Sequence, residues 1–385
     1  MRNQKSLVRG KTADAVVVGG GVAGLAVARA LSQRGLSVTL VERGRLGAEA
    51  SNAAAGMLAP QAEADAADKF FELACASRDL YPAFADALRE ETGTDIELER
   101  TGTLYLAFTE EDERETLNRY VWQTDAGLPV ERLSGAQARE LEPCISEDVL
   151  SALRFPLDVQ VENRRLVTAL ATSVEKLNVA LMTGTLVESL CIERGRVEGV
   201  ETARGFISSP KVVVASGAWT SSLSSNNMHV PNIRIEPVRG QMLCFETKPL
   251  LARHVIYSPR GYIVPRLDGR LLAGSTSERA GFDKRVTAAG IQMITTNALE
   301  ISPDVGALPL LDAWAGLRPR AADGLPVIGA CDGVEGLFYA TGHYRNGILL
   351  APVTGELLAE QIVNNRTPRL LEAFTPDRFQ YAGIA

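Results

Sequence analysis

The feature that most constrains the fold is a set of three glycines in G-x-G-x-x-G spacing, directly after a short and nearly all-apolar run at 13–18. Such a run predicts a strand that is buried on both faces. Gly19 permits a tight turn, Gly21 lets the backbone approach a pyrophosphate, and Gly24 lets a helix pack closely on the strand. Residues 25–31 are good helix formers. The sequence therefore predicts a strand, turn and helix that bind a dinucleotide.

A second strand is predicted over 36–42, and it ends in an acidic residue, Glu42, 18 positions after Gly24. An acid at this place in a βαβ unit accepts hydrogen bonds from the adenosine ribose. This combination is far more specific for a dinucleotide site than a glycine cluster alone, because the two strands, the glycines, the helix and the acid all occur in the expected order and spacing.

Two later segments favour FAD over NAD as the dinucleotide. Residues 212–219 form a strand-like run that includes Gly217, and residues 336–343 form another. The second run leads into an apolar helix predicted over 348–362. A cofactor whose second half reaches the C-terminal part of the chain is the arrangement of FAD enzymes.

Composition excludes several function classes. The 385 residues carry a net charge of −7, which argues against a nucleic-acid surface. The sequence contains no run of about 18 apolar residues, so no membrane span is predicted. Residues 1–11 lack an apolar core and predict a short disordered arm instead of a secretion signal. Three histidines and five widely spaced cysteines predict no metal site and no disulfide framework, which fits a cytoplasmic protein.

The order of segments predicts two interleaved domains. We expect an α/β fold in which a Rossmann-like FAD-binding domain is interleaved with an α+β substrate domain on a mostly antiparallel sheet. The FAD-binding domain is predicted from residues 12–88, 146–220 and 318–376, and the substrate domain from residues 89–145 and 221–317. Further predicted elements are helices over 70–91, 110–125 and 163–174, a strand pair over 98–108, a β-meander over 180–204 and a loop at 317–320.

From residue 14 to about 379 the chain resembles the D-amino acid oxidase family of flavoproteins, and it is most similar to the glycine oxidase branch. The stretches that carry the resemblance are 51–58, 262–266, 314–319 and 342–348. The resemblance implies contacts to the ADP half of FAD from Val22, Ala23, Glu42 and Arg43, and to adenine from the backbone of Val187. It places Ala50, Ser51, Ala55, Gly56 and Met57 beside the diphosphate and flavin, and His343, Tyr344, Arg345, Asn346, Gly347, Ile348 and Leu349 near the isoalloxazine.

The same resemblance implies the substrate pocket. Arg318 matches the arginine that binds the substrate carboxylate, a role that suits the planar guanidinium fork. Tyr262 and Arg345 match the residues that complete the pocket, and Met57 packs beside the flavin. From the residues alone other interpretations stay open: a surface arginine at 318, a core tyrosine at 262, an acid paired with Arg345, and a structural histidine at 343.

For activity, the resemblance implies oxidation of glycine, sarcosine and small D-amino acids to the imine or 2-oxo acid. Flavin N5 accepts the hydride, O₂ is reduced to H₂O₂, and no side chain is assigned as a catalytic base. In the family this reaction supplies glycine imine for the thiazole of thiamine, and members are often homotetramers, so a homo-oligomer is expected. Related oxidases attach flavin to a cysteine near Trp314, but Ala313 stands there, which predicts non-covalent FAD.

Alternatives remain at this stage. They are a broader D-amino acid or sarcosine oxidase, a quinone-linked D-amino acid dehydrogenase, the FAD-binding subunit of a larger complex, and a flavin module acting on modified tRNA. Arg260 and Ser277 depart from the glycine oxidase pattern, and a small polar residue at Ser277 predicts a wider pocket.

Overall fold

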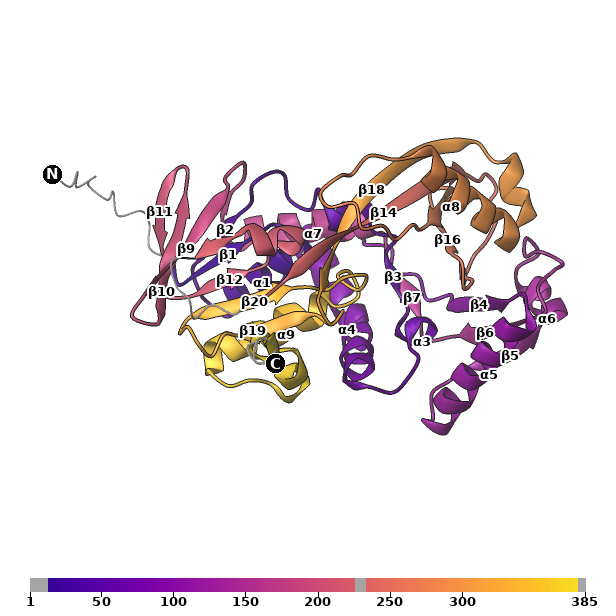
Figure 1. Cartoon of the computed structure of the whole chain (residues 1–385), viewed down its shortest axis with the longest axis horizontal. Coiled ribbons are helices and arrows are strands. Elements are labelled where there is room, and N and C mark those ends of the chain that lie inside the picture. The colour runs from indigo at the N-terminus through magenta and orange to yellow at the C-terminus, as the bar shows by residue number, and fades with distance from the viewer. Residues whose placement is uncertain (1–12, 226–232, 380–385) are drawn as a thin grey trace.

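The computed structural model describes residues 13–225 and 233–379. Two large sheets, one of six strands and one of eight, occupy opposite halves of an elongated molecule (Figure 1). The six-stranded sheet is parallel apart from one antiparallel edge strand, whereas the eight-stranded sheet is mostly antiparallel. The predicted α/β fold with a Rossmann-like sheet beside a mostly antiparallel sheet is therefore confirmed.

The six-stranded sheet has the order β19-β20-β12-β1-β2-β8. Its strands are β1 (Ala15–Val18), β2 (Val38–Val41), β8 (Ala180–Met182), β12 (Val212–Val214), β19 (Val327–Ala330) and β20 (Leu337–Thr341). One face packs on helices α1 (Val22–Gln33), α4 (Lys69–Thr92), α7 (Asn163–Lys176) and α9 (Ala351–Asn364). Alternation along β1 explains the layers, because Val17 faces these helices while Val16 and Val18 face the opposite side.

A four-stranded sheet covers that opposite side. Its strands, in the order β11-β10-β9-β13, are β9 (Val187–Glu193), β10 (Arg196–Thr202), β11 (Gly205–Ser208) and β13 (Ser224–Ser225). The predicted turn at 194–195 joins β9 to β10, where Arg194 and Gly195 both have positive φ.

The eight-stranded sheet has the order β18-β14-β17-β16-β15-β4-β6-β5. Its strands are β4 (Thr103–Ala107), β5 (Glu131–Ser134), β6 (Ser151–Phe155), β14 (Ile235–Glu246), β15 (Val255–Tyr257), β16 (Tyr262–Pro265), β17 (Arg270–Gly274) and β18 (Leu310–Ala321). Helices α5 (Glu110–Asp125), α6 (Gly135–Leu141) and α8 (Ala288–Ile301) accompany it. One face packs on α8, and the other packs on residues of segment 55–62.

The remaining elements are short. They are α2 (Ala50–Ala53), β3 (Met57–Leu58), α3 (Pro60–Glu63), β7 (Val159–Gln160), η1 (Gly217–Ser222), η2 (Pro303–Ala307), η3 (Arg369–Phe374) and η4 (Pro376–Phe379). Within residues 13–225 and 233–379, no helix combines the length and apolar character needed to cross a bilayer.

Two local predictions need correction. Residues 317–320 belong to β18 and not to a loop. Pro319 is compatible with this strand because β18 lies at the edge of the sheet, where a missing N–H donor is tolerated. The strand pair predicted over 98–108 reduces to β4, with an isolated bridge from Glu99 to Gln160. Strand β6 pairs with β4 and β5, so residues 151–155 belong to the eight-stranded sheet, and the bounds of the two domains stay a prediction.

Candidate functional site

A cavity enclosing about 1870 Å³ of empty space, part of it open to solvent, lies at the carboxyl ends of β1, β2, β12 and β20 and extends to β16 and β18. Dinucleotide and ligand sites of α/β sheets occur at this end of the strands. All the predicted site residues line this cavity except Gly24 and Leu349. Gly24 instead packs on the turn, and Leu349 is buried in the core. Segments from the beginning, middle and end of the chain therefore meet at one site.

The glycine turn leaves room in front of α1. Gly19 has φ +112°, and a Cβ there would lie 2.4 Å from the Ala215 carbonyl oxygen. Gly21 is the N-cap of α1 with no side-chain cap, and a Cβ there would meet only Ser51 Oγ, at 3.4 Å. The Val22 N–H donates to that hydroxyl at 3.0 Å. A helix N-terminus with open space in front of it suits the diphosphate of FAD.

Glu42 lies at the end of β2 with its carboxylate oriented by the backbone. Its Oε2 accepts a hydrogen bond from the Gly20 N–H and its Oε1 accepts one from the Gly44 N–H, each at 2.7 Å. A carboxylate has four acceptor positions, so lone pairs remain for ribose hydroxyls. The geometry fits the ribose contact that the sequence predicts.

Arg43 belongs to a cluster at the same end of the cavity. Its guanidinium lies 3.5 Å from the centre of the Trp219 ring and pairs with Glu49 at 2.7 Å. Glu49 also pairs with Lys284 at 2.8 Å, and Trp219 stacks on Phe282. Sequence reasoning missed these four residues, of which Trp219 and Glu49 contact Arg43 directly. Trp219 follows the glycine of a strand-end segment, but Glu49, Phe282 and Lys284 carry no motif.

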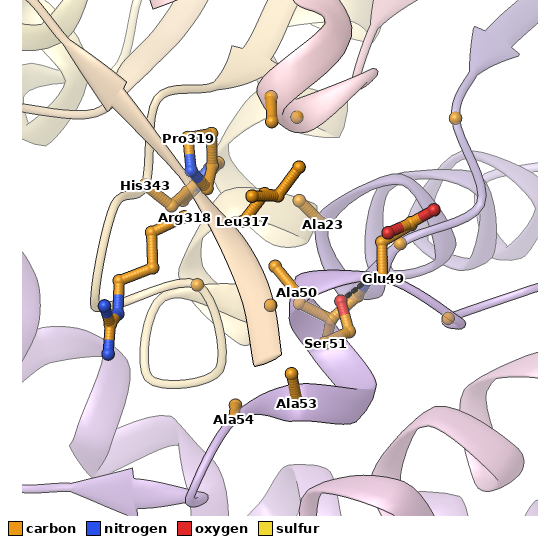
Figure 2. A pocket seen from close by; sticks show the side chains of 18 of the residues that line it. Ala23, Glu49, Ala50, Ser51, Ala53, Ala54, Leu317, Arg318, Pro319 and His343 are labelled. Atoms are coloured by element: carbon orange, nitrogen blue, oxygen red, sulfur yellow. Dashed lines mark hydrogen bonds between the residues drawn. The ribbon is translucent and has the colours of Figure 1, made fainter. Parts of the chain in front are cut away.

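Arg318 projects into the cavity from β18. Its Nη1 donates to the Thr276 carbonyl at 3.0 Å and its Nη2 donates to Ser275 Oγ at 2.7 Å. A Cβ at Gly240, on the adjacent strand, would lie 2.2–2.3 Å from the guanidinium, so the glycine leaves room for Arg318 in this position. Figure 2 shows the Arg318 guanidinium at the opposite side of the site from Glu49 and Ser51. Two of its five N–H groups are used, and the rest are available for a carboxylate.

Tyr262 is almost fully buried beside the cavity. Its hydroxyl donates to Met242 Sδ at 3.4 Å, and its ring centre lies 5.5 Å from that of Tyr257. Met57, on β3, is half-buried and lines the same cavity. Core packing and pocket lining are therefore combined at Tyr262.

Arg345 faces an acid that the sequence reasoning did not identify. Its Nη2 lies 3.5 Å from Glu63 Oε1, and the Tyr257 hydroxyl donates to the same oxygen at 2.7 Å. The carboxylate of Glu63 raises the pKa of Arg345 above its usual range. Burial and then Glu63 raise the pKa of Tyr257, which keeps the phenol protonated. Arg345 therefore pairs with an acid and also lines the cavity, and its contact to the substrate stays a prediction.

His343 is buried and contacts a hydroxyl within the fold, and its predicted place near the isoalloxazine stays a prediction. It is 5% exposed, and its Nε2 lies 3.0 Å from Thr354 Oγ1 on α9. Burial lowers the pKa of His343 to about 4, so the ring is neutral near pH 7. A neutral ring held by a hydroxyl adds no charge to the cavity.

The two departures from the family pattern lie outside the cavity lining. Arg260 Nε donates to Glu300 at 2.6 Å, and its guanidinium lies 3.5 Å from Asp112. Ser277 is exposed and does not line the cavity. The expectation that Ser277 widens the pocket is therefore wrong.

Comparisons with known proteins agree with the geometry. Residues 14–361 match a family described as FAD dependent oxidoreductase, DAO. The chain is 37% identical over 368 residues to a glycine oxidase of Geobacillus kaustophilus (strain HTA426), covering 95% of this chain and 97% of that protein. A crystal structure of glycine oxidase from Geobacillus kaustophilus has a TM-score of 0.91 at 36% identity, covering 95% of this chain and 99% of the other.

A longer relative carries a second function in its name. The bifunctional protein ThiO/ThiG of Trichormus variabilis (strain ATCC 29413 / PCC 7937) is 37% identical over 373 residues. The match covers 96% of this chain and 55% of that protein.

Substituting Gly21 tests the phosphate cradle. Gly21→Ala is sterically allowed at φ −76° but fills the space in front of α1, so we expect the dissociation constant for FAD to rise about tenfold or more while the fold is retained. Titration of the apoprotein with FAD measures this constant, and urea unfolding checks stability. Gly44→Ala is the matched control, since Gly44 lies outside the lining and its Cβ would make an ordinary contact. Equal FAD affinity in both variants would contradict the assignment.

Proposed function

Because the chain belongs to the DAO family of FAD-dependent oxidoreductases, we propose that it catalyses oxidative deamination of glycine, sarcosine and small D-amino acids. At a coarser level it is an FAD-dependent amine or amino acid oxidase of the glycine oxidase type. The proposed products are the imine or 2-oxo acid, with O₂ reduced to H₂O₂. Similarity to the ThiO/ThiG protein supports a role in supplying glycine imine for the thiazole of thiamine.

The observation that carries the proposal is the guanidinium of Arg318 on the cavity wall. Ser275 and Thr276 hold it in place, and no carboxylate pairs with it in the described ranges. A planar, unpaired fork on a cavity wall is suited to a substrate carboxylate. Bound FAD supplies the acceptor for the hydrogen and electrons that leave the substrate carbon.

The protein's own groups bind, orient and exclude water. Arg318 fixes the carboxylate and thereby orients the carbon that carries the amine, while Tyr262 and Met57 contribute apolar surface to the cavity. Burial lowers the pKa of His343 to about 4 and its Nε2 contacts Thr354, so the ring is a weak base and is assigned no proton transfer. The amine therefore reacts in its neutral form, which agrees with a chain of three histidines.

A peroxide-coupled assay tests the proposed function. Purified protein loaded with FAD is incubated in air with glycine, sarcosine and D-alanine, and we expect H₂O₂ with at least one of them. Turnover with a quinone but no peroxide would favour a dehydrogenase. No oxidation with either acceptor would contradict the proposal and favour a non-catalytic FAD-binding subunit. A homo-oligomer stays a prediction from the resemblance.

FAD is proposed to be bound without a covalent link. Ala313 stands where related oxidases carry the attachment cysteine, and all five cysteines are free, with Cys331 buried. We expect acid precipitation of the yellow protein to release all of its flavin into the supernatant, where absorbance measures it. Yellow colour that stays with the pellet would contradict the proposal.

Loss of the carboxylate fork should weaken substrate binding selectively. Arg318→Ala removes a charge-assisted pair, so KM for glycine or sarcosine should rise about 100-fold while FAD stays bound. Arg318→Lys keeps the charge without the fork and should lie between Arg318→Ala and the unmodified protein. Steady-state kinetics measure KM, and the flavin spectrum checks cofactor content. Unchanged KM in Arg318→Ala would remove this residue from the site.

A further inference from the structure

We propose that Glu63 restricts the site to amine substrates that carry one carboxylate and disfavours those that carry two. This inference rests on the proposed function. The substrate half of the cavity is the part beside Arg318 and Tyr262. Among the described residues, its charged lining side chains are Arg318, Arg345 and Glu63. Two guanidinium groups and one carboxylate leave a net charge of +1 there. That charge balances one carboxylate on a substrate whose amine is neutral.

The two arginines are not equivalent. Among the residues that the structure describes, the Arg318 guanidinium donates only to a hydroxyl and a carbonyl, so its charge is free to meet an anion. Arg345 already faces the carboxylate of Glu63, and its side chain is 47% exposed. A second carboxylate on the substrate reaches Arg345 only beside Glu63, where like charges repel.

Glu63 is held in place on two sides. The Tyr257 hydroxyl donates to Glu63 Oε1 at 2.7 Å. The backbone of α3, which ends at Glu63, is anchored because the buried carboxylate of Asp158 accepts from the N–H groups of Gln61 at 3.2 Å and Ala62 at 2.9 Å. An anchored carboxylate cannot simply move away when a second anion enters, so it discriminates between substrates instead of adapting to them.

The test compares sarcosine with iminodiacetate, which has the same secondary amine and a second carboxylate. Glu63→Gln removes one negative charge, and we expect the ratio of kcat/KM for iminodiacetate to that for sarcosine to rise at least about tenfold. Glu63→Asp keeps the charge and should stay near the unmodified protein. Glu300→Gln is the matched control, because Glu300 also pairs with an arginine, Arg260, but lies outside the cavity lining.

A double-mutant cycle identifies the partner. Adding Arg345→Gln to Glu63→Gln should abolish the gain for iminodiacetate, since the gain depends on the freed guanidinium. Arg345→Gln alone leaves Glu63 without its ion pair and should disfavour iminodiacetate further, which keeps the proposal testable if Glu63→Gln does not fold. A gain below tenfold in folded Glu63→Gln, an equal gain in Glu300→Gln, or a gain that survives Arg345→Gln would overturn the proposal.

Binding separates this inference from the proposed function. Acetate and malonate differ by one carboxylate, and their affinities follow from the change that each causes in the flavin absorption spectrum. Glu63→Gln should raise the malonate-to-acetate affinity ratio, and an unchanged ratio overturns the role of Glu63. If the protein oxidises no amine, the proposed function is wrong. The malonate-to-acetate affinity ratio still decides the role of Glu63 in that case.

Discussion

The site depends on a backbone contact that only glycine permits. A Cβ at Gly24 would lie 2.0 Å from the Gly19 carbonyl oxygen, and one at Gly19 would meet the Ala215 carbonyl oxygen. These contacts hold the start of α1 against the end of β1 and beside the end of β12. Because β12 and β20 are parallel neighbours, the segments that follow them also open onto the same edge of the sheet. One short turn thus fixes where residues from three distant parts of the chain must meet.

The pairing of β14 with β18 gives the site its substrate half. These two strands pair from Ile235 with Ala321 to Phe245 with Leu310. Figure 1 shows them between the two halves of the molecule. Arg318 lies on this ladder, and glycine at 240 leaves space for its guanidinium. The carboxylate-binding group is therefore carried by regular backbone, which holds it more rigidly than a loop would.

The sequence predicts best where one local pattern determines both backbone and chemistry. The glycine spacing predicts a turn, a helix start and an anion site at once. Gly19, Gly21 and Glu42 line one cavity, and their contacts to FAD stay predictions. Arg318 was expected on a loop, because Pro319 is typical of one. The strand that carries Arg318 pairs with residues about 80 positions earlier in the chain. Proline is tolerated there because the strand lies at the edge of the sheet, and a local sequence pattern does not show which strand is at an edge. Contacts across sheets fall outside what periodicity can predict.

Glu63 illustrates this most clearly, because segment 55–63 carries no motif that marks its last residue as a pocket group. Two buried charged residues from elsewhere shape the segment. Arg266 donates to the Ala55 carbonyl at 2.6 Å and to the Val161 carbonyl at 2.8 Å, while Asp158 binds the backbone of α3. Burial raises the pKa of Asp158 to about 7 and lowers the pKa of Arg266 to about 10, so both charges are costly to bury. The backbone contacts that they make at the two ends of the segment hold Met57 and Glu63 on the cavity wall, which gives these buried charges a role in geometry and not only in stability.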